Sequence, residues 1–309
     1  DRARKIAEAV VRQEEVLAVV GQYTSDSTLA AADVYQKNQL VFVSPTSTSE
    51  DLSNFGKSHH PSFFFRTVPS DRFTAQALAQ YLRQQANQQN VAVFYNRRSR
   101  YSQSILNEFR SRFEASGGKI VDDSLATIPP GKAIDKAVKK GAKVLALFPN
   151  TQRGIWNQTL KLINANECKY PMIGGDTLYN PELLDGVGKK AAQCLVLAVP
   201  WHRMDSPNKD FPQAAEKLWA GSVSWRTALA YDATQVLIKA LETPGQLSRT
   251  TVQQVLANPN FQANGATGTI RFLSNGDRNK NESKSTIKLV KLAVNKEGNL
   301  IFVPLDTIP

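Results

Sequence analysis

The chain has 309 residues, which is more than one hydrophobic core ordinarily serves, so we expect two lobes. Hydrophobic residues make up 41% of it, but no apolar run approaches the roughly 18 residues of a membrane span, so we expect no stable membrane insertion. The net charge of +11 is scattered in short basic knots without interleaved aromatic residues, which argues against nucleic acid as a partner.

The predicted elements alternate between helix and strand. Residues 1–11 form a charged amphipathic pattern, typical of a helix and not of a signal peptide. Six short apolar runs follow at 16–21, 40–44, 90–95, 143–148, 171–175 and 194–199. They lack period-two alternation, which indicates strands that are covered on both faces. Helical patterns lie between them at 72–86, 101–116 and 225–242, and in the second an apolar stripe of Tyr101, Ile105, Phe109 and Phe113 recurs every four residues. This alternation predicts α/β architecture with parallel sheets, one in each lobe.

The last part of the chain has a different pattern. Residues 275–277 (Asn-Gly-Asp) and 297–299 (Glu-Gly-Asn) are turn signals, and apolar segments flank them. We therefore predict a short antiparallel ribbon that completes one lobe.

The two cysteines, Cys168 and Cys194, are too few for a disulfide scaffold and wrongly spaced for zinc. Each lies beside an apolar strand, so neighbouring strands could bring them together. Two interpretations stay open: a disulfide, which requires an oxidising compartment, or two buried free thiols.

The sequence lacks the recognisable motifs of an enzyme. It contains no dinucleotide-binding or Walker glycine loop, no nucleophile elbow and no zinc-protease motif. His59 and His60 lie in a predicted loop, where a metal site is the less favoured interpretation, and His202 stands alone. Paired acids fall on helix surfaces, caps or turns, and none forms a convincing acid–base pair. We expect neither catalysis, nor a metal, nor a cofactor.

Polar side chains recur just after the strands, where open α/β sheets bind ligands. The segments are "QYTSDST" (22–28), "PTSTSED" (45–51), "NRRSRYS" (96–102), "PNTQR" (149–153) and "DTLYN" (176–180). Together they could form many directional hydrogen bonds to one small polar molecule.

Helix capping competes with ligand binding at these positions. Residues 48–51 have a capping-box pattern in which Ser47 or Thr48 accepts helix N–H groups, and residues 25–27 could begin a helix similarly. Capping does not exclude binding, because N–H groups at a helix start attract a carboxylate. Asp176 follows two glycines with no basic residue nearby in sequence, which suits pairing with an ammonium group.

The ordered motifs resemble a known family. The series "VLAVVGQYTSDST", "LVFVSPTSTSEDL", "FFFRTVPSD", "VAVFYNRRSRYSQS", "PMIGGDTLYNPELL" and "ALAYDATQVLIKAL" resembles the type I periplasmic solute-binding proteins. The branch it resembles most is that of the branched-chain amino-acid receptors (Leu/Ile/Val-binding protein-like) of ABC transporters. The resemblance implies two α/β lobes, each a mostly parallel sheet flanked by helices, with three crossovers and the ligand in the interlobe cleft.

The resemblance also implies a ligand site. In the family, hydroxyls and backbone N–H groups of the segment like "SPTST" bind the α-carboxylate, and an acid holds the α-ammonium. The matching residues are Ser25, Thr46, Ser47 and Thr48 for the carboxylate, Asp176 for the ammonium, and Tyr101 and Asn150 along the cleft. We add Tyr23 and Tyr179 from their positions after strands.

The family crossovers imply the lobe boundaries. They place residues 1–67 with 200–270 in the first lobe and 68–199 with 271–309 in the second. The family opens with a strand, a helix and a second strand, whereas this chain begins at the next helix. We therefore expect at least one βα unit of the first lobe to be missing, as a truncation or as a segment supplied by another chain.

These observations lead to a functional expectation. The resemblance implies a non-enzymatic binding protein that captures an amino acid outside the cytoplasm, in the periplasm or another extracytoplasmic space. It implies delivery of the ligand to the permease of an ABC importer. Two alternatives remain: a ligand-sensing domain of the same fold in signalling, and binding of a different molecule such as an amide or another polar metabolite.

Overall fold

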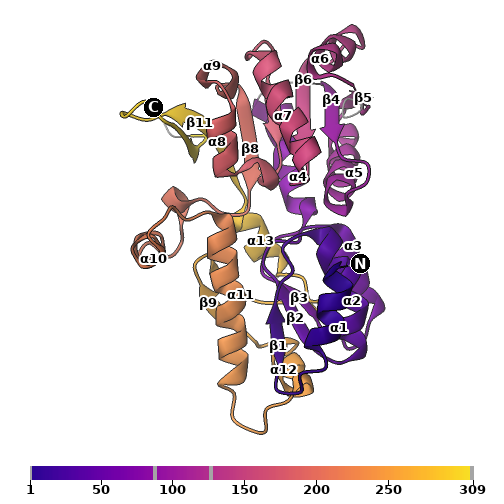
Figure 1. The fold of residues 1–309 in the computed structure, drawn as a ribbon, viewed down its shortest axis with the longest axis vertical. Coiled ribbons are helices and arrows are strands. Elements are labelled where there is room, and N and C mark those ends of the chain that lie inside the picture. Colours follow the sequence, from indigo (N-terminus) through magenta and orange to yellow (C-terminus); the bar gives the residue numbers. More distant parts are fainter. Residues whose placement is uncertain (1, 86–88, 125–127, 307–309) are drawn as a thin grey trace. The chain divides into compact units, whose positions relative to one another are not determined.

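The computed structural model describes residues 2–85, 89–124 and 128–306 (Figure 1). It divides into two compact units. The first unit comprises Asp1–Ser70 and Asp205–Thr286, and the second comprises Asp71–Met204 and Ile287–Pro309. Among the described residues, no helix has both the length and the apolar character that crossing a membrane requires.

The first unit is built on a three-stranded parallel sheet in the order β1-β2-β3. Its amino-terminal elements are α1 (Arg2–Val10), β1 (Ala18–Val20), α2 (Ser25–Lys37), β2 (Val41–Ser44), α3 (Glu50–Ser58) and β3 (Phe64–Arg66). The later elements are α10 (Phe211–Trp219), α11 (Trp225–Leu241), α12 (Arg249–Leu256), β9 (Ala263–Gly265), β10 (Gly268–Ile270) and α13 (Lys280–Thr286). β9 and β10 form a separate antiparallel hairpin.

Both faces of the central strand β2 are buried. Val41 and Val43 of β2 pack into a cluster with residues of α11 and α12, whereas Phe42 packs with residues of α1 and α2. Helices therefore cover β2 on both sides, which explains why three apolar residues follow one another in it without alternating with polar ones.

The second unit contains a seven-stranded sheet in the order β12-β11-β8-β7-β6-β4-β5. Its strands are β4 (Asn90–Tyr95), β5 (Lys119–Asp122), β6 (Val144–Phe148), β7 (Met172–Gly174), β8 (Leu195–Val199), β11 (Lys288–Val294) and β12 (Leu300–Pro304). Its helices are α4 (Asp71–Gln80), the π-helix η1 (Tyr81–Gln85), α5 (Arg100–Ala115), α6 (Pro130–Lys139), α7 (Arg153–Asn166), the 3₁₀ turn η3 (Asp176–Leu178), α8 (Pro181–Gly186) and α9 (Lys189–Ala192).

The strands from β8 to β5 are parallel, and β11 pairs antiparallel with β8 and with β12. β11 and β12 are the predicted ribbon at the end of the chain. On α5, the predicted apolar stripe of Tyr101, Ile105, Phe109 and Phe113 is buried in one cluster with residues of β4 and β6. The six predicted strands and the three predicted helices are therefore all present.

The third crossover differs from the expected position. Residues 271–286 lie in the first unit, whereas the sequence placed them in the second lobe. Arg278 fixes them there, because its buried guanidinium donates to the Thr67 carbonyl at 3.1 Å and lies 3.9 Å from the buried carboxylate of Asp232. The 275–277 turn thus belongs to the first unit, and the antiparallel ribbon begins only at β11.

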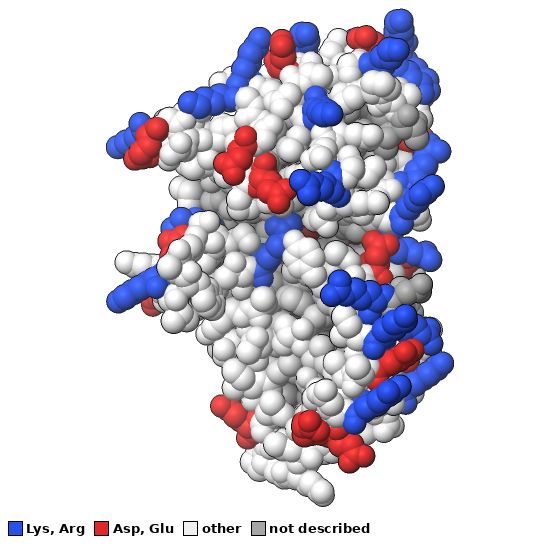
Figure 2. Space-filling view, viewed as in Figure 1, with Lys and Arg blue, Asp and Glu red and all other residues white. Residues whose placement is uncertain are grey.

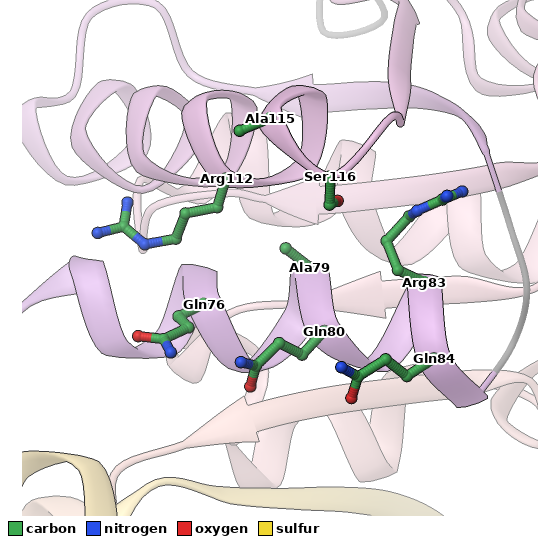
Figure 3. Close-up of a pocket in the computed structure, with 8 residues that line it drawn as sticks. All are labelled: Gln76, Ala79, Gln80, Arg83, Gln84, Arg112, Ala115 and Ser116. Carbon is green, nitrogen blue, oxygen red and sulfur yellow. The ribbon is translucent and has the colours of Figure 1, made fainter.

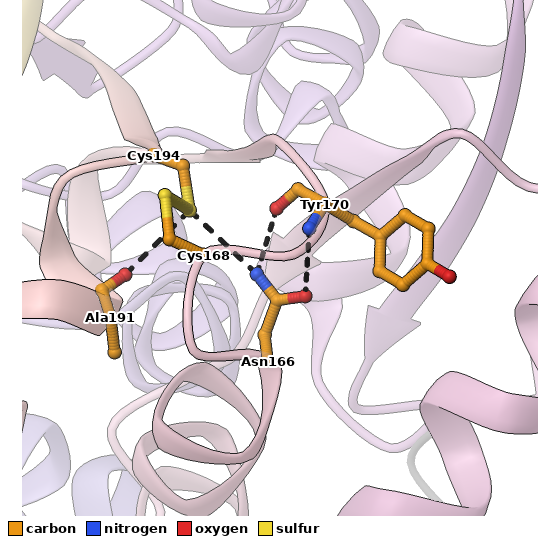
Figure 4. The surroundings of a disulfide bond; sticks show 5 residues. All are labelled: Asn166, Cys168, Tyr170, Ala191 and Cys194. Atoms are coloured by element: carbon orange, nitrogen blue, oxygen red, sulfur yellow. Dashed lines mark hydrogen bonds between the residues drawn. A yellow bond between two sulfur atoms is a disulfide. The ribbon is translucent and has the colours of Figure 1, made fainter.

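Cys168 and Cys194 are joined by a disulfide in the second unit, with Cα atoms 5.4 Å apart (Figure 4). The bond links the turn after α7 to the start of β8. Asn166 holds the same turn, since its side chain donates to the Tyr170 carbonyl at 2.7 Å and accepts from the Tyr170 N–H at 3.2 Å. The bonds of Asn166 and the disulfide together fix the loop that leads into β7.

Candidate functional site

The candidate residues fall into two groups, one in each unit. We call Ser25, Thr46, Ser47 and Thr48 the hydroxyl cluster; they follow β1 and β2 in the first unit. We call Tyr101 and Asp176 the Tyr101–Asp176 pair; they follow β4 and β7 in the second. Each group is assembled by parallel strands whose carboxyl ends meet at one edge of a sheet.

Hydrogen bonds join the segments that follow β1 and β2. The Thr46 hydroxyl donates to the Tyr23 carbonyl at 2.6 Å, and the Ser44 hydroxyl donates to the Gln22 carbonyl at 3.1 Å. The Ser47 hydroxyl lies 2.7 Å from that of Thr28 in α2. Thr46 and Ser47 are therefore occupied within the protein, and they hold the two loops together.

The helix caps are not the residues that the sequence pattern favoured. The Thr24 hydroxyl caps α2 by accepting from the Ser27 N–H, and the Ser49 hydroxyl caps α3 by accepting from the Asp51 N–H, both at 3.2 Å. Neither Ser47 nor Thr48 caps the helix. Each helix begins one or two residues away from the expected position, so the hydroxyl cluster is not needed for capping.

Ser25 and Thr48 retain hydrogen-bonding capacity. Both are buried, at 1% exposure each. The Ser25 hydroxyl oxygen accepts from the Ser49 N–H at 3.2 Å, which leaves its own proton to donate. The Thr48 hydroxyl has no hydrogen-bond partner among the described residues. A buried hydroxyl without a partner costs about 1–3 kcal/mol, so this group calls for an acceptor that the described part of the chain does not supply.

A buried arginine supports the backbone of the cluster. Arg66 is fully buried at the end of β3, and one of its nitrogens donates to the carbonyls of Ser47 and Ser49 at 3.1 and 3.0 Å. Its charge is balanced by Asp277, 2.8 Å away in the 275–277 turn. Sequence reasoning missed both residues, although an arginine inside the apolar run "FFFRTV" is a signal, because a buried charge requires a partner.

In the second unit, Tyr101 and Asp176 are directly bonded. The Tyr101 hydroxyl donates to the Asp176 carboxylate at 2.7 Å, and the two residues are 8% and 3% exposed. Tyr101 lies in the first turn of α5, which begins after the cap residue Ser99, and Asp176 opens η3 directly after β7. Sequence separation between them is large, and the parallel pairing of β4, β6 and β7 brings them together.

Gly175 makes this contact possible. A Cβ atom at position 175 would overlap the Tyr101 hydroxyl and crowd Ile105. Any larger residue there would push the tyrosine away from the carboxylate. The glycine in "GGDTLY" is thus part of the geometry that positions Asp176.

The electrostatic environment keeps Tyr101 protonated. Burial, followed by the negative charges of Asp176 and Asp71, raises the pKa of Tyr101 well above its usual value. The phenol therefore remains a donor at any physiological pH. Asp71, which is buried at the start of α4, adds negative potential to this end of the sheet, and sequence reasoning did not identify it.

The other candidate residues have separate surroundings. Tyr23 is 53% exposed, and its ring lies 5.9 Å from the guanidinium of Arg226. Asn150 accepts from the amide of Asn96 at 3.1 Å, at the ends of β6 and β4. Tyr179 is buried with its ring stacked on Phe302. Burial raises the pKa of Tyr179 to about 12. Their roles as ligand contacts stay predictions.

The residues that could hold a metal do not gather. Within the described ranges, no three His, Cys, Asp or Glu side chains are placed to share an ion. The chemistry that the two groups offer is hydrogen bonding to an acceptor in the first unit and attraction of a cation in the second.

Comparison with known proteins identifies the family of the chain. A family model described as periplasmic binding protein matches residues 1–291. The chain belongs to the periplasmic binding protein family. This match, together with the structural likeness below, confirms the predicted fold class.

A periplasmic binding protein of Rhizobium johnstonii, a Leu/Ile/Val-binding protein, is 28% identical over 236 residues. The match covers 74% of this chain and 60% of that relative's length. An ABC transporter substrate-binding protein of Desulfitobacterium hafniense, solved in complex with Leu, has a TM-score of 0.76 at 26% identity. That likeness covers 98% of this chain and 84% of the other. These relatives confirm the resemblance to the branched-chain amino-acid receptors.

A third periplasmic binding protein widens the range of ligands found on this fold. A solute-binding protein of Rhodopseudomonas palustris, solved with 3,4-dihydroxy benzoic acid, has a TM-score of 0.77 and covers 98% of this chain. At 17% identity it shows the fold alone. The relatives named are binding proteins, but their ligands differ.

Proposed function

We propose that this chain is the solute-binding protein of an ABC importer and captures an amino acid outside the cytoplasm. The observation that carries the proposal is the buried Thr48 hydroxyl, which lacks a partner among the described residues. The next residue, Ser49, donates its N–H to the Ser25 hydroxyl. An α-carboxylate has the acceptor oxygens that the Thr48 and Ser25 hydroxyls need, and hydrogen bonds to a charged group are about twice as strong as neutral ones.

The second part of the proposal concerns the α-ammonium group. Asp176 is buried and accepts a hydrogen bond from Tyr101, and an ionised carboxylate is the natural counter-charge for an ammonium group. In this scheme one ligand joins the two groups, with its carboxylate at the hydroxyl cluster and its ammonium at Asp176. Hinged closure of the kind known for periplasmic binding proteins would then remove water from both charges.

The location is part of the same proposal. A disulfide persists in oxidising compartments such as the periplasm and is rare in the cytoplasm. The Cys168–Cys194 bond therefore supports an extracytoplasmic site of action.

Calorimetric titration with a panel of amino acids tests the proposal. We expect micromolar or tighter binding of at least one, and loss of at least a hundredfold in affinity for Asp176→Asn, because a buried ammonium then lacks its counter-charge. Asp185→Asn is the matched control, since Asp185 is exposed on α8 and should leave affinity unchanged. An amino-acid panel without binders would contradict the amino-acid assignment, and so would binding of hydroxybenzoates in a parallel titration when no amino acid binds.

A further inference from the structure

A cavity lies within the second unit (Figure 3). One side of it is formed by α4 and η1, and the other side is formed by α5. Its volume of about 550 Å³ is in the range of about 300–1,000 Å³ typical of ligand pockets. Its lining residues are Gln76, Ala79, Gln80, Arg83, Gln84, Arg112, Ala115 and Ser116. We call this cavity the α4–α5 groove.

One rim of the groove carries a row of amides. Gln76, Gln80 and Gln84 lie four residues apart along α4 and η1, and Figure 3 shows them in line, directed away from α5. Each amide both donates and accepts hydrogen bonds, as a peptide group does. Ala79 and Ala115 leave room between the helices because their side chains are small. A row of such groups suits an extended peptide backbone.

The π-helix contributes to the shape of the groove. η1 continues α4 directly and carries Arg83 and Gln84. A π-helical turn is rare and is frequently found at functional sites. It widens the helix at the end of the groove where Arg83 lies.

Both ends of the groove are basic. Figure 3 shows Arg112 and Arg83 at opposite ends, and no Asp or Glu is among the lining residues. The Arg112 guanidinium bonds to the carbonyl of Glu108 at 3.1 Å and to its carboxylate, which orients it from outside the groove. Guanidinium groups bind carboxylates with two parallel hydrogen bonds, so the ends favour acidic side chains.

The charge around the groove is unbalanced. Residues 83–143 contain twelve Lys and Arg against five Asp and Glu, a net +7 of the chain's +11. In Figure 2, basic side chains predominate along the edge where α5, β5 and α6 lie in Figure 1. A field of this sign attracts acidic partners and accelerates their association.

We propose that the α4–α5 groove binds an acidic, extended peptide segment of a protein partner. The glutamine amides pair with its backbone, and Arg83 and Arg112 bind its carboxylates. This site is separate from the hydroxyl cluster and from the Tyr101–Asp176 pair, so the proposal goes beyond amino-acid binding and does not depend on it.

Fluorescence anisotropy with labelled hexaglutamate tests the proposal on the full chain, at about 50 mM salt to limit screening. We expect saturable binding that weakens about tenfold in the double variant Arg83→Gln/Arg112→Gln, since each partly exposed ion pair accounts for a fewfold change. The matched control is Lys132→Gln/Lys143→Gln, which removes the same charge from exposed positions outside the groove. It should weaken binding less than threefold.

Two further experiments distinguish peptide binding in the groove from diffuse charge attraction and from membrane binding. Gln80→Ala should weaken hexaglutamate and leave hexametaphosphate unchanged, because only the peptide has a backbone for the amide. Equal losses in the two double variants would overturn the proposal and indicate diffuse charge attraction. Capture of the protein by vesicles containing about one-third phosphatidylglycerol, with no binding of hexaglutamate, would also overturn it and assign the surface to a membrane.

Discussion

The hydroxyl cluster and the Tyr101–Asp176 pair differ in the charge of the groups that they offer to a ligand. In the first unit the donors are neutral, and Thr48 is buried without a partner among the described residues. In the second unit the key group is charged, and it is already bonded to Tyr101. Burying a neutral donor without a partner costs about 1–3 kcal/mol, whereas burying a charged carboxylate costs more and requires a donor beside it even before a cation binds.

The supports differ as well. Arg66 holds the backbone of the hydroxyl cluster through the carbonyls of Ser47 and Ser49, so the fold of the first unit and its donors share one side chain. The Tyr101–Asp176 pair depends instead on close approach over Gly175. Substitutions near the two groups should therefore change the free energy of unfolding and the affinity for the ligand by different relative amounts.

The largest effect on stability is expected at Arg66. Arg66→Met removes the partner of Asp277, whose side chain is only 17% exposed, and takes one donor away from each of the Ser47 and Ser49 carbonyls. Breaking a buried pair costs about 3–5 kcal/mol, so we expect the free energy of unfolding to fall by about that amount. Urea unfolding measures it, and amino-acid affinity should fall with it.

Arg271→Met is the control for that change. Arg271 pairs with Glu282 in the same unit, but its side chain is 49% exposed. An exposed pair contributes at most about 1 kcal/mol, so the free energy of unfolding should hardly change. If the free energy of unfolding fell by a similar amount in the two variants, the Arg66–Asp277 pair would contribute no more than an exposed ion pair, and Arg66 would not be the support of the hydroxyl cluster.

A smaller effect on stability is expected at Thr48, where a substitution should lower the affinity for the ligand without lowering the free energy of unfolding. Thr48→Val replaces a buried hydroxyl that lacks a partner among the described residues, so the free energy of unfolding should stay the same or rise by up to about 1 kcal/mol. Affinity for the amino acid should fall about tenfold or more, because a bond to the carboxylate is lost. Calorimetry and thermal unfolding check both. Thr48→Ser, which keeps the hydroxyl, should retain affinity; a Val variant that binds normally would refute the role of Thr48.

Much of the framework was predictable from the sequence. The apolar runs without alternation identified the strands, because helices cover both faces of β2 and of the central strands in the second unit. The stripe on α5 identified the buried face of that helix. The polar segments after the strands pointed to both groups, since parallel strands bring their carboxyl ends to one edge of a sheet.

The rest depended on contacts between distant parts of the chain. Which serine or threonine caps a helix is decided by one or two residues of register, so Thr24 and Ser49 were not distinguished from their neighbours. The pairing of Arg66 with Asp277 joins residues far apart in sequence, and the position of the third crossover follows from that pairing and from Arg278. The α4–α5 groove required the packing of two helices and a π-helical turn that no sequence pattern indicated.

The most direct test of the account measures whether the two groups read the two ends of one ligand. Thr48→Val, Asp176→Asn and the unchanged protein are titrated with the amino acid that binds, with its deaminated acid and with its amide. We predict that Asp176→Asn weakens the amino acid at least a hundredfold but leaves the deaminated acid nearly unaffected. We predict that Thr48→Val weakens the amino acid more than the amide, because the neutral amide carbonyl accepts a weaker hydrogen bond than a carboxylate does. Equal losses for a ligand and its truncated analogue, in either variant, would contradict the account.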